Sequence, residues 1–230
     1  MNENNSVVSK NGNMVSSQVA DYLMEWIKEN GLKPGDKIPP ELELTKILNI
    51  GRSSVREAIA TLKSRNIVEV RRGCGTFLSN SPGMVEDPLG LDFFPDKTSL
   101  AKDWGIVRLI IEPSITELAA INATPEDIEK LMESWEILTE SRDDPELHFA
   151  ADSAFHELLA EATHNVVINK LFPIIQEGIH NFMTQTDYFH TEEIRRLHHD
   201  ILKAVVTHDA AKARAAMELL ICVNQDLLGS

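Results

Sequence analysis

The stretch GRSSVREAI at residues 51–59 most restricts the folds open to this chain. Arg52 and Arg56 stand four residues apart, so in a helix they project from one face, with Ser53 and Ser54 beside them. The aliphatic residues recur at helical spacing on the opposite face: Val55, Ile59 and Leu62. Arginine suits guanine edges and phosphates, and short hydroxyls suit phosphates. The pattern is typical of a DNA recognition helix, although spacing alone leaves a solvated basic face as the alternative.

The following segment favours the recognition helix. Residues 67–78, IVEVRRGCGTFL, form two β-rich runs around a glycine-bearing turn, which predicts a hairpin with Arg71 and Arg72 near its tip. Upstream, apolar residues at helical spacing predict two further helices, within residues 19–31 and 41–48. Three helices followed by a basic-tipped hairpin make a winged helix-turn-helix.

The net charge of −14 is divided unevenly along the chain. Residues 1–80 carry 11 Lys and Arg against 9 Asp and Glu, whereas residues 81–230 carry 11 against 27. The first part is therefore compatible with binding DNA despite the acidic total. The acidic remainder must have another role.

The chain divides into segments of different character. We expect a disordered tail at residues 1–14, a winged helix-turn-helix at 15–80, a linker with three prolines at 81–98 and a helical domain at 99–228. The helical domain reads as a six-helix antiparallel bundle, so the fold class is mainly α. The expected helices are 100–122, 125–141, 145–163, 165–187, 190–207 and 209–227.

Location and redox state follow from what the sequence lacks. No run approaches the ~18 apolar residues of a membrane span, and the polar N-terminus lacks the blocks of a signal peptide. We therefore expect a cytoplasmic protein without membrane contact. Cys74 and Cys222 lie far apart and fit no zinc or disulfide spacing, so both are expected to be free thiols.

One pair in the acidic part could carry chemistry. Asp152 and His156 share a helical face, and a carboxylate with an imidazole can bind a divalent metal. A surface pair or a buried structural histidine is the alternative from this spacing. Further ligands would come from the downstream histidines, but spacing does not choose among them: His180, His190, His198 and His199.

The chain resembles the GntR family of transcriptional regulators, in the FadR subfamily with an FCD effector-binding domain, over residues 15–225. In the first half the matching stretches are LKPGDKIPPELEL (32–44), GRSSVREA (51–58) and RGCGTF (72–77). In the second half they are VRLIIEP (107–113), DSAFH (152–156), Asn165, HHDI (198–201), Asp209 and Met217.

The resemblance implies roles for particular residues. The implied DNA-contacting residues are Arg52, Ser53, Ser54, Arg56, Arg72 and Gly73. The implied metal ligands are Asp152, His156 and His198, with zinc the expected divalent ion, and the implied effector contacts are Arg108 and Asn165. Two positions depart from the family pattern, because Leu42 replaces a DNA-contacting arginine and Leu220 replaces the last histidine ligand. The alternative to metal binding is therefore that Asp152, His156 and His198 bind the effector directly through hydrogen bonds.

The sequence thus predicts a ligand-responsive DNA-binding regulator, a repressor, and not an enzyme. As a homodimer it would bind a palindromic operator in double-stranded DNA, since pairing two recognition helices multiplies the discrimination of one. Its acidic domain would bind a small carboxylate metabolite, with the metal, and alter operator binding. A metal-responsive regulator without an organic effector and a metal-dependent hydrolase are the alternatives.

Overall fold

The computed structural model describes residues 16–229, apart from residue 86 and residues 184–191. The expected tail at 1–14 and the expected helix ends at 187 and 190 lie outside the described residues. The chain divides into two compact units, with the boundary between Pro88 and Leu89. Each unit encloses its own apolar core.

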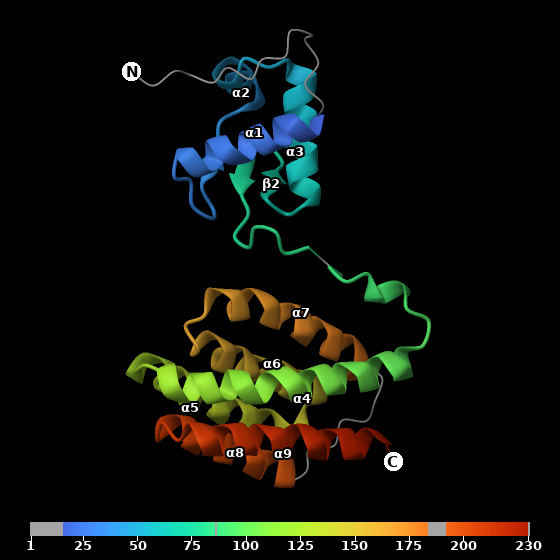
Figure 1. Cartoon of the computed structure of the whole chain (residues 1–230), viewed down its shortest axis with the longest axis vertical. Coiled ribbons are helices and arrows are strands. Elements are labelled where there is room, and N and C mark those ends of the chain that lie inside the picture. Colours follow the sequence, from blue (N-terminus) through green and yellow to red (C-terminus); the bar gives the residue numbers. More distant parts are fainter. Residues whose placement is uncertain (1–15, 86, 184–191, 230) are drawn as a thin grey trace. The chain divides into compact units, whose positions relative to one another are not determined.

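The first unit combines three helices with a small antiparallel sheet (Figure 1). Its elements are α1 (Ser16–Glu29), β1 (Lys37–Ile38), α2 (Glu41–Leu48), α3 (Arg52–Ser64), β2 (Val68–Arg71) and β3 (Gly75–Leu78). The hairpin β2–β3 pairs Val70 with Thr76 and Arg71 with Gly75. This is a winged helix-turn-helix, which confirms that part of the predicted fold class. The sequence analysis missed β1, because a two-residue strand has no alternation to detect.

The apolar face predicted for α3 packs into the core of this unit. Val55 and Leu62 are fully buried, and Ile59 is nearly so, together with Leu23 of α1 and Leu44 of α2. Burial of this face fixes the rotation of α3 about its axis, so its polar residues point outward.

The second unit is a bundle of six α-helices within the described residues (Figure 1). They are α4 (Lys97–Asn122), α5 (Pro125–Glu140), α6 (Pro145–Glu161), α7 (Val166–Met183), α8 (Glu192–Val206) and α9 (Ala210–Gly229). Two short 3-10 turns accompany them, η1 (Leu91–Phe93) and η2 (Ser141–Asp143). Helix α4 packs against α6, α7, α8 and α9 along one side and keeps an exposed face on the other. No helix in the described ranges is long and apolar enough to cross a bilayer.

Side-chain caps set the starts of three helices of the bundle, α4, α5 and α6. Thr124 and Asp127 form a reciprocal capping box at α5. The carboxylate of Asp144 accepts hydrogen bonds from the backbone N–H groups of Glu146 and Leu147 and so begins α6. Helix α4 begins at Lys97 rather than near residue 100, because Asp96 caps it by accepting from the N–H of Ser99.

Candidate nucleic-acid interface and metal site

The two arginines of α3 project into solvent from one face. The side chains of Arg52 and Arg56 are 70% and 68% exposed. Ser53 is exposed and Ser54 half-buried beside them. Gly51 precedes the helix and provides no side-chain cap, so the first backbone N–H groups of α3 are potential hydrogen-bond donors to an anion. This face therefore offers a ligand both guanidinium groups and the backbone N–H groups at the start of α3.

Glu41 at the start of α2 lies close to both arginines. Its carboxylate oxygens are 3.8 Å from Nε of Arg52 and 3.9 Å from Nε of Arg56. These distances exceed hydrogen-bond length, and exposed pairs of this kind contribute only about 0–1 kcal/mol. Glu41 therefore leaves the N–H donors of both arginines available. The sequence analysis assigned no role to Glu41.

The hairpin β2–β3, which forms the wing of this unit, places further cations near its tip. The guanidinium of Arg71 lies 4.4 Å from the ring centre of Phe77 and pairs with Glu69. Arg72 and Gly73 are exposed at the turn, and Gly73 has φ 75°, a conformation that a side chain would strain. Arg71 is thus held against the hairpin, while Arg72 remains open to a ligand.

Leu42 interrupts this basic surface. It is 63% exposed on α2, next to Glu41, where the family pattern has an arginine. An exposed leucine offers apolar contact instead of a forked donor.

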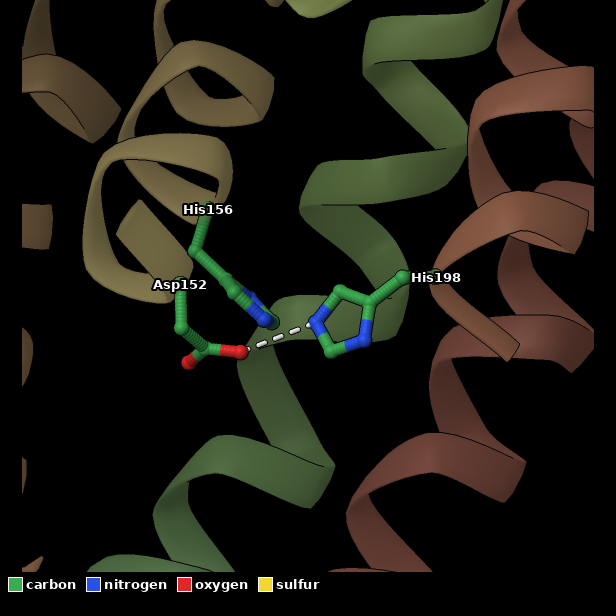
Figure 2. A group of neighbouring side chains, drawn as sticks. All are labelled: Asp152, His156 and His198. Atoms are coloured by element: carbon green, nitrogen blue, oxygen red, sulfur yellow. Dashed lines mark ion pairs between the residues drawn. The ribbon is translucent and has the colours of Figure 1, made fainter. Parts of the chain in front are cut away.

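In the second unit, three side chains from two helices converge in the interior of the bundle. Figure 2 shows Asp152 and His156 projecting from α6 toward His198 of α8. Each offers one ligand atom, and these atoms lie within 4.8 Å of one another. All three are buried, at 6%, 2% and 1% exposure. Nε2 of His198 lies 3.0 Å from an oxygen of Asp152. The expected ligand set is therefore assembled.

The other ring nitrogen of each histidine faces a fixed acceptor. Nδ1 of His198 lies 3.0 Å from the backbone carbonyl of Ile194 in its own helix. Nδ1 of His156 lies 2.8 Å from Oε2 of Glu112, on α4. Metal-binding histidines commonly use one nitrogen in this way and present the other to the ion.

Both imidazoles keep buried nitrogens that lack an aligned hydrogen bond: Nδ1 and Nε2 of His156, and Nε2 of His198. Their contacts with Glu112 and Asp152 are short enough for hydrogen bonds, but the angles at the ring nitrogens fall outside the range of a hydrogen bond. Rotation of a terminal planar ring is soft, so a small turn of either imidazole would align these two contacts. Buried nitrogens with unused lone pairs beside a carboxylate are a donor set that suits a divalent cation.

The pKa values of the two carboxyls favour their anionic forms. Burial raises the pKa of Glu112. The positive charge of Arg108 and the contact between Glu112 and His156 outweigh burial, and the pKa of Glu112 falls to about 2. Burial also raises the pKa of Asp152, and His198, His156 and Arg108 together bring it below its usual range. Arg108 thus offsets the charge of one of two carboxylates, which favours binding of a further cation.

Arg108, the expected contact for a carboxylate effector, is buried in an ion pair. Its Nε and Nη2 donate to the two oxygens of Glu112, at 2.5 and 3.3 Å. An incoming carboxylate would have to share this guanidinium with Glu112.

The remaining expected residues lie elsewhere. Asn165 is exposed, and its side-chain oxygen accepts from the N–H groups of Val167 and Ile168 at the start of α7. Asn165 therefore acts as the cap of α7. Leu220 is fully buried in the bundle core.

Of the downstream histidines, His199 is exposed, with its ring 5.6 Å from that of Trp135. The neighbouring His198 is therefore the one that completes the triad. The side chains of His180 and His190 lie outside the described residues.

Comparison with known families agrees with both units. Residues 15–78 match the bacterial regulatory proteins of the gntR family, and residues 106–221 match the FCD domain. The chain belongs to the GntR family. It is a DNA-binding transcriptional regulator with an FCD domain, consistent with the FadR-like subfamily. The matching families are transcriptional regulators, which confirms the prediction that the chain is not an enzyme.

Individual relatives span most of the regulator. It is 32% identical to the Uxu operon transcriptional regulator of Escherichia coli K12, over 92% of this chain and 86% of the relative. It is 28% identical to the transcriptional repressor NanR of Enterobacter sp. strain 638, over 89% and 81%. The solved structure of Streptococcus agalactiae GntR is 33% identical, with a TM-score of 0.83 over 92% of this chain and all of that one.

Glu112 is the residue of this site whose role the sequence analysis missed. Its position four residues after Arg108 was the only local signal, and such a pair on a helix usually reads as a surface ion pair. Only the packing of α4 against α6 shows that it contacts His156.

Proposed function

We propose that this regulator represses transcription by binding a palindromic operator as a homodimer, and that a small carboxylate metabolite bound with a divalent cation in the FCD domain alters operator binding. Zinc is the cation we propose. Operation in the cytoplasm, where operator DNA lies, is part of the same proposal.

The exposed face of α3 supports the DNA-binding part. Arg52 and Arg56 are anchored by a buried apolar face behind them and are only loosely paired with Glu41. We assign base reading to these arginines and phosphate contact to Ser53 and Ser54. Arg72 and Gly73 at the wing would approach the neighbouring groove.

The buried triad is the observation that carries the sensing part. One carboxylate and two imidazoles form a donor set that suits zinc. A divalent cation there would supply positive charge and an open coordination position for an oxygen ligand. Asp152 contributes the anionic ligand, and His198 is oriented by the carbonyl of Ile194. Arg108 would bind a carboxylate on the effector, in competition with Glu112.

The occupied state of Arg108 favours one alternative. Because its guanidinium already binds Glu112 through two donors, the domain could respond to the metal itself without an organic acid. Both versions share the triad and differ in whether an acid changes DNA affinity.

A gel-shift experiment separates these readings. The full-length protein is titrated onto the DNA upstream of its own gene, with and without Zn²⁺, a chelator, and a panel of hydroxy acids, sugar acids and dicarboxylates. We expect a specific complex whose affinity changes with one class of acid. Sensitivity to the chelator but to no acid would favour the metal-responsive alternative. Absence of any specific complex would overturn the DNA-binding proposal.

A further inference from the structure

The contact between Glu112 and His156 assigns a role to a residue outside the ligand triad. Glu112 is 1% exposed, and its Oε2 lies 2.8 Å from Nδ1 of His156. It is not among the three residues whose ligand atoms lie mutually within 4.8 Å. Glu112 therefore faces the imidazole from outside the cluster of ligand atoms.

Arg108 holds Glu112 in this place. Two donors of the guanidinium bind the two carboxylate oxygens, at 2.5 and 3.3 Å. The same Oε2 that accepts from Nη2 of Arg108 also faces His156, so the guanidinium fixes the oxygen that lies against the imidazole. A buried carboxylate fixed from one side by a guanidinium is a strong and directional acceptor for the ring N–H on its other side.

We propose that Glu112 is a positioning residue of the metal site: clamped by Arg108, it holds the His156 ring with Nδ1 protonated, so that Nε2 is the nitrogen that binds the cation. This inference rests on the proposed metal site and goes beyond it, because it adds a residue on a third helix. It also gives the pair Arg108–Glu112 a function in the absence of any effector carboxylate. An acid that draws Arg108 away would loosen Glu112 and, through His156, the metal.

The test is Zn²⁺ affinity, measured on the full-length protein by competition with a chromophoric chelator. In Glu112→Gln the acceptor loses its charge while its size is kept, and loss of such a partner typically weakens metal binding 10- to 100-fold. We expect a loss in that range. The matched control is Glu117→Gln, which removes a carboxylate from the same helix that also pairs with an arginine, Arg214, at 2.9 Å, away from the triad. It should bind Zn²⁺ as the wild type does.

His156→Ala separates failure of the site from failure of the inference. If the wild type does not bind Zn²⁺, or if His156→Ala binds it equally well, the proposed metal site is wrong and the role of Glu112 falls with it. If His156→Ala loses Zn²⁺ while Glu112→Gln matches Glu117→Gln, the metal site stands and the positioning role is overturned.

A spectroscopic measurement on the wild type covers the case in which Glu112→Gln does not fold. Long-range ¹H–¹⁵N correlation spectra of the Zn²⁺-loaded protein report which ring nitrogen carries the proton. We expect protonated Nδ1 and metal-bound Nε2 for His156. The reverse assignment would overturn the proposal without reference to any variant.

Discussion

At the scale of single residues, the arginines of α3 combine exposure with orientation. Both arginine side chains are more than two-thirds exposed, yet a carboxylate oxygen of Glu41 lies within 4 Å of Nε of each. Weak pairing of this kind leaves the donors of both side chains available to DNA.

Replacing Arg52 with Ala removes a forked donor that we assign to base reading. We expect a loss of about 1–3 kcal/mol of specific operator binding and a weaker preference among operator sequences. Fluorescence anisotropy with operator and scrambled duplexes measures both effects. Lys63→Ala, which removes an exposed cation at the far end of α3, should instead weaken both duplexes alike and flatten the salt dependence. Equal losses on both duplexes for Arg52→Ala would show that Arg52 contacts only phosphate.

The candidate metal site could be predicted only in part. The spacing of Asp152 and His156 predicted their common face, and the helix that carries them begins at the predicted Asp144–Pro145 signal. His198 came from the family resemblance, because nothing in a spacing of 42 residues indicates that α8 returns to α6. Glu112 and its contact with His156 depend on the packing of three helices, which a sequence pattern does not determine.

At the scale of elements, the start of a helix was more predictable than its surroundings. Thr124–Pro125–Glu126 signalled the start of α5, and the structure has a capping box there. Capping depends on a few adjacent residues, which a sequence displays directly. Strand β1 depends instead on pairing with β3, some 40 residues away, as in the register Lys37 to Phe77.

The capping box provides a test of helix stability. Thr124→Ala leaves the N–H of Asp127 without its side-chain acceptor, and we expect the free energy of unfolding to fall by about 1 kcal/mol. Denaturant unfolding followed by circular dichroism measures the change. The matched control is Thr139→Ala near the other end of α5, where the hydroxyl only donates to the carbonyl of Glu136 within the helix. It should change stability by less than about 0.5 kcal/mol, and an equal loss in both variants would refute the capping role.

At the scale of the whole molecule, the division of charge matches the division of roles. The unit with the recognition helix is close to neutral overall with its cations gathered on α3 and the wing, while the acidic residues lie mainly in the FCD-containing part. The acidic bundle should therefore repel DNA and leave the winged helix as the DNA-contacting unit.

Dimerisation follows from the proposed palindromic operator, and α4 presents a surface suited to it. Three isoleucines at helical spacing on α4 are more than half exposed: Ile106, Ile110 and Ile121. We expect sedimentation equilibrium to give twice the 25.7 kDa of one chain, because such an apolar stripe favours burial against a second copy. Ile110→Glu should shift the protein toward monomer. Ile137→Glu, an equivalent change at an exposed isoleucine on α5, should remain dimeric. A dimer that persists in Ile110→Glu would place the interface elsewhere.

The central claim is that one unit of this regulator binds DNA while the other binds the ligand. Its most direct test is the operator affinity of the wild type and of His156→Ala. Anisotropy titrations are made in matched buffers with chelator, with Zn²⁺, and with Zn²⁺ plus the acid panel. We expect ligand to change the wild-type operator Kd by about 5- to 150-fold, while His156→Ala binds the operator with the ligand-free affinity in every buffer. A His156→Ala protein that responds as the wild type does would contradict this division of roles.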